Sequence, residues 1–202
     1  MTNATPPSGT SGSKPLRPAA VGGFTLVELL VTITIVGILA TIAVPNFWVM
    51  VQNTRISTMS TDLTLALQYA KSEAVKRNVR VYLCANNDAD TDCPGAGAGW
   101  SNGWRVQTGN CEDDAVGATA LRKWDPSSGV NVCYGAGQTD ITFLGTGFTS
   151  GDMGTYAICD NRGPTSAKGV ILTLQGRTRA ATDSNDADTI KEDGSGTNLS
   201  CP

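Results

Sequence analysis

The sequence predicts an α+β fold, in which one long N-terminal helix packs on an antiparallel β-sheet. Three observations lead to this prediction. Residues 24–77 follow a helical pattern and begin with a long apolar stretch. From residue 78 onward, short β-branched runs alternate with clusters of glycine, asparagine and aspartate, a pattern typical of strands and turns. Six cysteines in a chain with 23 glycines indicate disulfides in this loop-rich region.

The N-terminal helix is predicted from a polar segment followed by an apolar one. Residues 1–20 are rich in proline, serine, glycine and threonine, and we expect them to be disordered. From Phe24 to Met50 the only charged residue is Glu28, and the stretch can span the roughly 30 Å hydrocarbon layer of a membrane. The stretch is too long for a signal peptide, and no small-residue cleavage site follows it. An ordinary anchor would leave Glu28 unexplained, because a carboxylate costs about 3 kcal/mol near the membrane centre and less near an end.

Helical spacing continues beyond Pro45, so residues 24–77 are predicted to form one helix about 80 Å long at ~1.5 Å per residue. Small and apolar residues form a stripe along its second half, and charged residues lie mostly away from that stripe. The stripe is more typical of a surface packed against a sheet than of a binding site. Its members are Ile56, Met59, Leu63, Ala66, Leu67, Ala70 and Ala74.

The stretch GFTLVELLVTITIVGILATIAVPNF resembles the N-terminus of type IV pilins and type II secretion pseudopilins. The resemblance implies that a prepilin peptidase cuts between Gly23 and Phe24 and methylates Phe24. Glu28 would then be the fifth residue, where this family pairs a glutamate with a neighbouring subunit's N-terminal amine. Pro45 would be the twenty-second, the place of the family's helix-bending proline. The implied partners are this peptidase and methylase, other pilin subunits, and the inner membrane before assembly.

The leader, residues 1–23, carries the cations Lys14 and Arg17, which suit the cytoplasmic side of the membrane. The resemblance implies a single-pass inner-membrane protein with a periplasmic domain, which reaches the cell surface in a type IV pilus. The leader is longer than in major pilins, which suggests a minor pilin or a pseudopilin. Cleavage would change the net charge from −3 to −5, so binding to nucleic acid would require a local cationic patch.

The globular region is predicted over residues 78–182, with an acidic tail at 183–202. We expect one meander-like antiparallel sheet with strands at 79–84, 103–108, 119–124, 140–145, 154–160 and 169–175.

A narrower resemblance, to the FimT/GspH family of minor pilins and pseudopilins, covers most of residues 24–182. That family often has a strand ending in cysteine, an acidic loop, a second cysteine and a strand containing Gly-Trp. The stretch LCANNDADTDCPGAGAGWSNGWRVQ matches this order, and ITFLGTGF and GTYAICD resemble later strands. The matching residues are Cys84, Cys93, Trp100, Gly103 and Trp104.

Six cysteines allow fifteen complete disulfide pairings, and sequence alone does not choose among them. With this resemblance, we expect a bridge that ties the acidic loop and another that pins the tail to the sheet. The expected pairs are Cys84–Cys93, Cys159–Cys201 and, from what remains, Cys111–Cys133.

No metal site, cofactor or enzymatic activity is expected. The chain has no histidine, no tight cysteine pair, no nucleophile motif and no phosphate loop. Asp88, Asp90 and Asp92 place oxygens at alternate positions, but the EF-hand pattern that would favour calcium is absent. Tryptophans can serve as stacking platforms for bases, but we expect packing roles for Trp100, Trp104 and Trp124.

The stretch Gly176-Arg177-Thr178-Arg179 matches the GRxR motif that the FimT branch associates with DNA binding during natural transformation. If the chain is extended here, Arg177 and Arg179 point to one face, roughly 6–7 Å apart. Arginine forks fit phosphates, and we expect Gly176 to let a ligand's backbone approach closely. Lys168 is a weaker candidate for the same patch. Binding would follow the phosphates and not the base sequence.

Two considerations oppose the DNA hypothesis. The chain as a whole is acidic, and the tail after the motif is acidic too and would repel a polyanion if it folds beside the arginines. The alternative is that the motif is structural and the protein is a GspH-like pseudopilin of a type II secretion system.

Overall fold

A computed structural model of the chain describes residues 23–86, 99–109, 111, 119–125, 127–135, 138–183 and 190–201. The contacts divide it into two compact units, with the boundary between Val44 and Pro45. The predicted helix is present as α1, Leu26–Arg77, which contributes to both units. Among the described residues, α1 is the helix long and apolar enough to cross a membrane, by length and composition alone.

In the first unit, α1 begins directly after Thr25. The Thr25 hydroxyl accepts a hydrogen bond from the Glu28 main-chain N–H at 3.2 Å, which satisfies one of the free donors at the helix start. Thr32, Thr34 and Thr41 donate their hydroxyl protons to carbonyls three or four residues earlier. These bonds let polar side chains sit in an apolar helix without unpaired donors.

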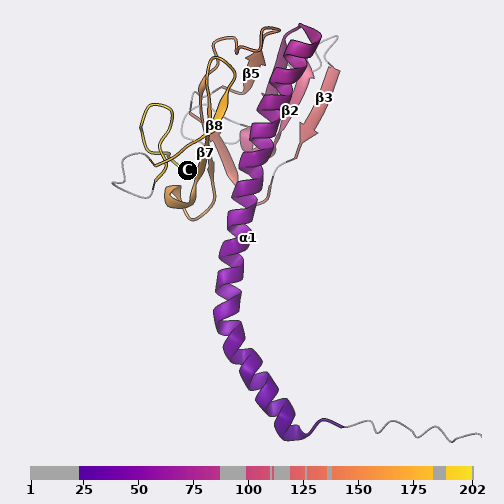
Figure 1. Ribbon diagram of the computed structural model, residues 1–202, viewed down its shortest axis with the longest axis vertical. Helices are drawn as coiled ribbons and strands as arrows, with labels where there is room; N and C mark the ends of the chain where they lie inside the picture. Colours follow the sequence, from indigo (N-terminus) through magenta and orange to yellow (C-terminus); the bar gives the residue numbers. More distant parts are fainter. Residues whose placement is uncertain are drawn as a thin grey trace, which may run out of the picture. The chain divides into compact units, whose positions relative to one another are not determined.

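The second unit, from Pro45 onward, contains the rest of α1 and two four-stranded antiparallel sheets. One sheet has the order β3-β2-β1-β5 and the other β4-β6-β7-β8, and α1 runs along them (Figure 1). The strands are β1 Val81–Ala85, β2 Trp104–Thr108, β3 Thr119–Trp124, β4 Asn131–Tyr134, β5 Asp140–Phe143, β6 Gly154–Cys159, β7 Lys168–Leu172 and β8 Thr178–Ala180. Short 3₁₀ turns lie at Trp100–Asn102 and Pro164–Ser166.

All six predicted strands are present, but the prediction of one meander-like sheet is wrong. The strands belong to two sheets, and β5 pairs with β1 and not with a neighbour in sequence. Strands β4 and β8 were not among the six. They have four and three residues, and such short runs do not show a clear alternation of apolar and polar residues.

The main core lies where α1 meets the sheets. Every member of the predicted Ile56–Ala74 stripe is buried there, which confirms it as a packing surface. Trp100 and Trp104 are fully buried and Trp124 is 8% exposed. The Trp100 indole N–H donates to the Gln138 carbonyl at 2.8 Å. The tryptophans therefore pack the core and offer no open face to a base.

A second, smaller core lies around the C-terminal tail, which folds onto the β6–β7 region. The predicted Cys159–Cys201 bridge is present, with Cα atoms 5.8 Å apart. The Glu192 main-chain N–H donates to the Thr182 carbonyl at 3.1 Å, which adds a main-chain attachment for the tail. The buried members of this core are Ala157, Cys159, Ala167, Ile171, Ala181 and Leu199.

The other two disulfide predictions are wrong. Cys84 pairs with Cys111, with Cα atoms 5.6 Å apart, so neither Cys84–Cys93 nor Cys111–Cys133 forms. The reason is the pairing of β1 with β2, which places Arg105 opposite Cys84. The Arg105 guanidinium in turn donates to the Cys111 carbonyl at 3.5 Å, so Cys111 lies beside that position. Strand pairing, and not nearness in sequence, selects the partner. Asp88, Asp90 and Asp92 lie outside the described residues.

Candidate nucleic-acid interface

The hairpin between β7 and β8 carries the predicted DNA-binding motif. The Gly176 N–H donates to the Thr173 carbonyl at 2.8 Å, and the Thr173 N–H donates to the Arg177 carbonyl at 3.0 Å. Gly176 has a φ of 64°, in the left-handed region that favours glycine. This is a three-residue hairpin loop with a glycine bulge, and it places Arg177 at the first residue after the loop.

Gly176 is buried, so the expectation that it lets a ligand's backbone approach is wrong. A Cβ atom at this position would lie 2.6 Å from the Gly147 carbonyl oxygen. The Lys71 ammonium on α1 donates to the carbonyls of Gln175 and Gly176, at 2.7 and 3.2 Å. The backbone that approaches Gly176 is therefore the protein's own, and the glycine positions the arginine that follows it.

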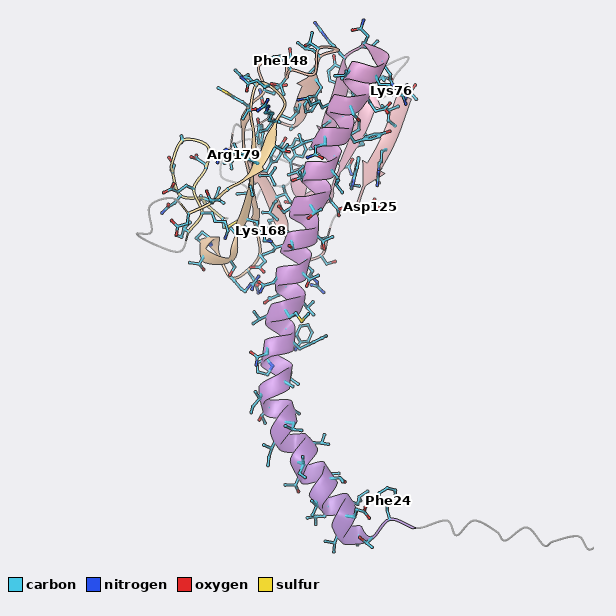
Figure 2. All side chains as sticks on the ribbon, in the orientation of Figure 1. Phe24, Lys76, Asp125, Phe148, Lys168 and Arg179 are labelled. Atoms are coloured by element: carbon cyan, nitrogen blue, oxygen red, sulfur yellow. A yellow bond between two sulfur atoms is a disulfide. The ribbon has the colours of Figure 1, made fainter. Side chains whose placement is uncertain are left out.

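Arg177 and Arg179 lie on the face of the hairpin that points away from α1. Strand pairing places Thr178 opposite Leu172, which is buried in the main core, and the Gln68 side chain on α1 donates to the Thr178 hydroxyl at 3.4 Å. Since alternate residues face opposite sides, the two arginines share the other face. Both are exposed, and within the described chain neither guanidinium has a hydrogen-bond or ion-pair partner. Figure 2 labels Arg179 on β8.

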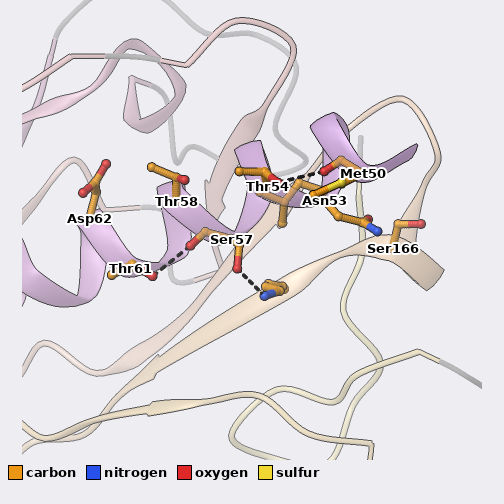
Figure 3. A pocket seen from close by; sticks show the side chains of 10 residues that line it. Met50, Asn53, Thr54, Ser57, Thr58, Thr61, Asp62 and Ser166 are labelled. Atoms are coloured by element: carbon orange, nitrogen blue, oxygen red, sulfur yellow. Dashed lines mark hydrogen bonds between the residues drawn. The ribbon is translucent and has the colours of Figure 1, made fainter. Parts of the chain in front are cut away.

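Lys168 does not belong to this patch, which corrects the weaker of the sequence predictions. It lies on β7 in step with Val170 and Leu172, so it faces α1. Its ammonium donates to the Ser57 hydroxyl at 2.8 Å, beside a groove of about 730 Å³ (Figure 3). This bond ties β7 to the helix and leaves the charge of Lys168 on the opposite face of the sheet from the arginines.

The acidic tail does fold beside the arginines. Arg179 and Asp193 line the same groove, of about 600 Å³, together with Thr155 and Ser195. The Asp193 carboxylate accepts hydrogen bonds from the main-chain N–H groups of Ser195 and Thr197, at 2.7 and 3.0 Å. Partial burial opposes ionisation, but these bonds and the Ser195 hydroxyl lower the pKa of Asp193. Asp193 thus keeps its negative charge at neutral pH while its own turn holds the carboxylate, in the groove that Arg179 also lines.

Lys71 was missed by the sequence analysis, although it anchors the arginine hairpin. It lies more than a hundred residues before the carbonyls that it holds. The one signal in the sequence is a lysine next to the buried stripe residue Ala70.

The N-terminal residues named by the pilin resemblance lie in or near the exposed part of α1. Phe24 is 80% exposed, Glu28 is in the first turn of the helix, and Pro45 is inside it. Cleavage after Gly23, methylation of Phe24 and pairing of Glu28 with another subunit stay predictions.

Comparison with known proteins agrees with this architecture. The family model described as type II transport protein GspH matches residues 60–176, and the prokaryotic N-terminal methylation motif matches residues 19–44. Two crystal forms of the Pseudomonas aeruginosa type IV minor pilin FimU share the fold at 23% identity. They cover 61% and 64% of this chain and 90% of FimU, with TM-scores of 0.50 and 0.51. No curated protein matches. An N-terminal methylation motif precedes the region that matches the GspH model. Because the GspH model spans more than half of the chain, this protein belongs to the GspH family.

Proposed function

We propose that this protein is a minor pilin of a type IV pilus that binds extracellular DNA through Arg177 and Arg179 and so aids DNA uptake in natural transformation. The observation that supports this proposal most is the pair of exposed guanidiniums on one face of the β7–β8 hairpin. Neither is neutralised by a described residue of the chain.

The hairpin geometry suits a phosphate backbone. Side chains two residues apart in an extended strand lie roughly 6–7 Å apart, close to the spacing of successive phosphates. Each guanidinium offers a planar fork of N–H donors that fits phosphate oxygens. The described residues around the pair form no set that reads base edges, so binding is expected to follow the phosphates and to weaken with salt.

The proposed life cycle follows from the N-terminal segment. A prepilin peptidase cuts between Gly23 and Phe24, and α1 holds the subunit in the inner membrane with the sheets in the periplasm. Glu28 then pairs with the terminal amine of a neighbouring pilin, which offsets the cost of its carboxylate among apolar helices. In the pilus, the arginine hairpin would meet DNA outside the cell.

The test measures binding of duplex DNA to the full chain in a neutral detergent, at several salt concentrations. Arg177→Ala combined with Arg179→Ala should weaken binding at low salt by at least about tenfold. It should also flatten the log–log salt dependence by about 1.8, from two lost phosphate contacts. Arg80→Ala combined with Lys123→Ala removes two exposed cations outside the β7–β8 hairpin and is the charge-matched control. Equal binding by the double variant and the parent would refute the proposal.

A second candidate function is that of a structural pseudopilin of a type II secretion system. The description of the matching family, a type II transport protein, favours it. Deleting the gene separates the two candidates in the native organism. Loss of transformation with normal protein export supports the DNA-binding pilin, whereas loss of export with normal transformation supports the pseudopilin.

A further inference from the structure

Exposed apolar side chains gather beside the arginine hairpin. Among the described residues that follow α1, the large apolar side chains with substantial exposure are Val79, Phe148, Met153 and Leu174. Phe148, Met153 and Leu174 are 51%, 56% and 38% exposed. We call these three the apolar rim. Their placement leaves an aromatic ring and two flexible apolar side chains in contact with solvent.

Main-chain contacts join the rim to the arginines. The Thr149 N–H donates to the Leu174 carbonyl at 2.9 Å, so the loop that carries Phe148 is bonded to the hairpin turn. The Gly147 carbonyl packs on Gly176, which directly precedes Arg177. Phe148 and Arg177 are therefore each one residue away from the same backbone contact.

The rim also borders the groove at Arg179. Met153 and Leu174 line the groove of about 600 Å³ that Arg179 and Ser195 line as well. Figure 2 labels both Phe148 and Arg179 in the part of the molecule that carries the sheets. Met153, Leu174 and Arg179 thus share one groove with the Asp193 carboxylate. The loop that carries Phe148 is attached to this groove through the bond of Thr149 to Leu174.

We propose that Arg177, Arg179 and the apolar rim together bind single-stranded DNA, with phosphates at the guanidiniums and unpaired bases against the rim. This inference rests on the proposed DNA-binding function. In a duplex the faces of the bases are stacked inside, so only the arginines find partners. A single strand exposes its bases, and these stack on aromatic side chains whatever their sequence. A polyanion also satisfies the two guanidiniums, which have no partner among the described residues and would repel the same pair on a second copy of the protein.

The test compares two labelled DNA ligands of equal length, an oligothymidylate and a mixed-sequence duplex, with the full chain in neutral detergent. Phe148→Ala should weaken single-strand binding by about five- to tenfold and duplex binding by less than about twofold. Phe148→Trp keeps an aromatic face and should retain single-strand binding. Leu174→Ala provides a second rim variant should Phe148→Ala lower the unfolding temperature.

The outcomes separate this inference from the function on which it rests. If the double arginine variant loses both ligands while the rim variants lose neither, the rim binds no bases and the proposed DNA-binding function stands. If the rim variants lose both ligands equally, the preference for single strands is likewise refuted. If the double arginine variant keeps both ligands, the DNA-binding function itself fails. Selective loss of the single strand in the rim variants supports the inference.

Discussion

The two faces of the β4-β6-β7-β8 sheet differ in how their basic side chains are bonded. On the face toward α1, Lys168 donates to Ser57, and the Arg162 guanidinium pairs with the Asp160 carboxylate at 2.7 Å. On the other face, Arg177 and Arg179 have no partner among the described residues. A positive charge near the packed helix must be paired because it loses water, whereas a charge on the outer face keeps its water and stays available.

The comparison of the two faces explains why the Gly176–Arg179 motif alone is weak evidence for DNA binding, and why its position on the outer face is stronger evidence. Lys168 and Arg179 lie in adjacent strands, yet the alternation of side chains sends one toward the helix and the other away from it. The acidic tail shares the outer face with the arginines and lies close enough to line a groove with Arg179. The accessibility of the pair thus depends on how the tail is held.

The largest expected effect comes from cutting the tail free. Cys159→Ala with Cys201→Ala removes a bridge that closes 42 residues, which costs about 4 kcal/mol in the chain-entropy account of disulfides. Chemical denaturation of the full chain in detergent measures this loss. Hydrogen exchange should rise in residues 190–201 and stay low in the β1–β2 pair, which the Cys84–Cys111 bridge still ties. An equal rise of exchange in residues 190–201 and in the β1–β2 pair would contradict the separation of the tail core from the main core.

The next effect concerns the glycine that positions Arg177. Gly176→Ala places a Cβ in the left-handed region and against the Gly147 carbonyl, so we expect a loss of about 2 to 3 kcal/mol. Gly151→Ala is the matched control, because φ is 104° there and nothing lies within 4 Å of the added Cβ. The control should cost about 1 kcal/mol, from backbone strain alone. Equal losses would mean that the contact with Gly147 contributes nothing.

A smaller effect tests the role of Lys168 on the face of the sheet toward α1. Lys168→Met removes the bond to Ser57 and should lower stability by about 1 kcal/mol. Duplex DNA affinity should stay unchanged, because this side chain faces α1. Ser57→Ala removes the same bond without changing the charge and is the control. A loss of affinity with Lys168→Met but not with Ser57→Ala would place Lys168 in the DNA interface after all.

The smallest effect is the pH dependence of the tail turn. The pKa of Asp193 is lowered in the folded chain, so its contribution to stability is fully present above its unfolded pKa of about 3.9. That contribution is lost as pH falls through the folded value. Amide exchange at Ser195 and Thr197, which donate to this carboxylate, should therefore accelerate in acid. Asp193→Asn should remove the acid dependence, and its persistence would point to another carboxyl group.

Local sequence patterns were enough to predict much of the fold. The apolar stretch, the stripe at Ile56–Ala74 and six strands follow from periodicity, because burial on one face imposes a repeat that a short window reveals. The arginine pair was also visible, since an extended segment after a glycine puts alternate side chains on one face. The tail bridge was expected beside the family resemblance and not from a local pattern, and the structure contains it.

The sequence by itself determined the long helix, its packed stripe, most strands and the two arginines that share a face, because each depends on spacing within a few residues. Only the tertiary structure decided the two-sheet order, the Cys84–Cys111 bridge, the burial of Gly176 under Gly147 and the side on which Lys168 lies. Each of these depends on contacts between segments far apart in the chain. Such contacts are set by which strands pair and which face meets α1, and no local pattern records that choice.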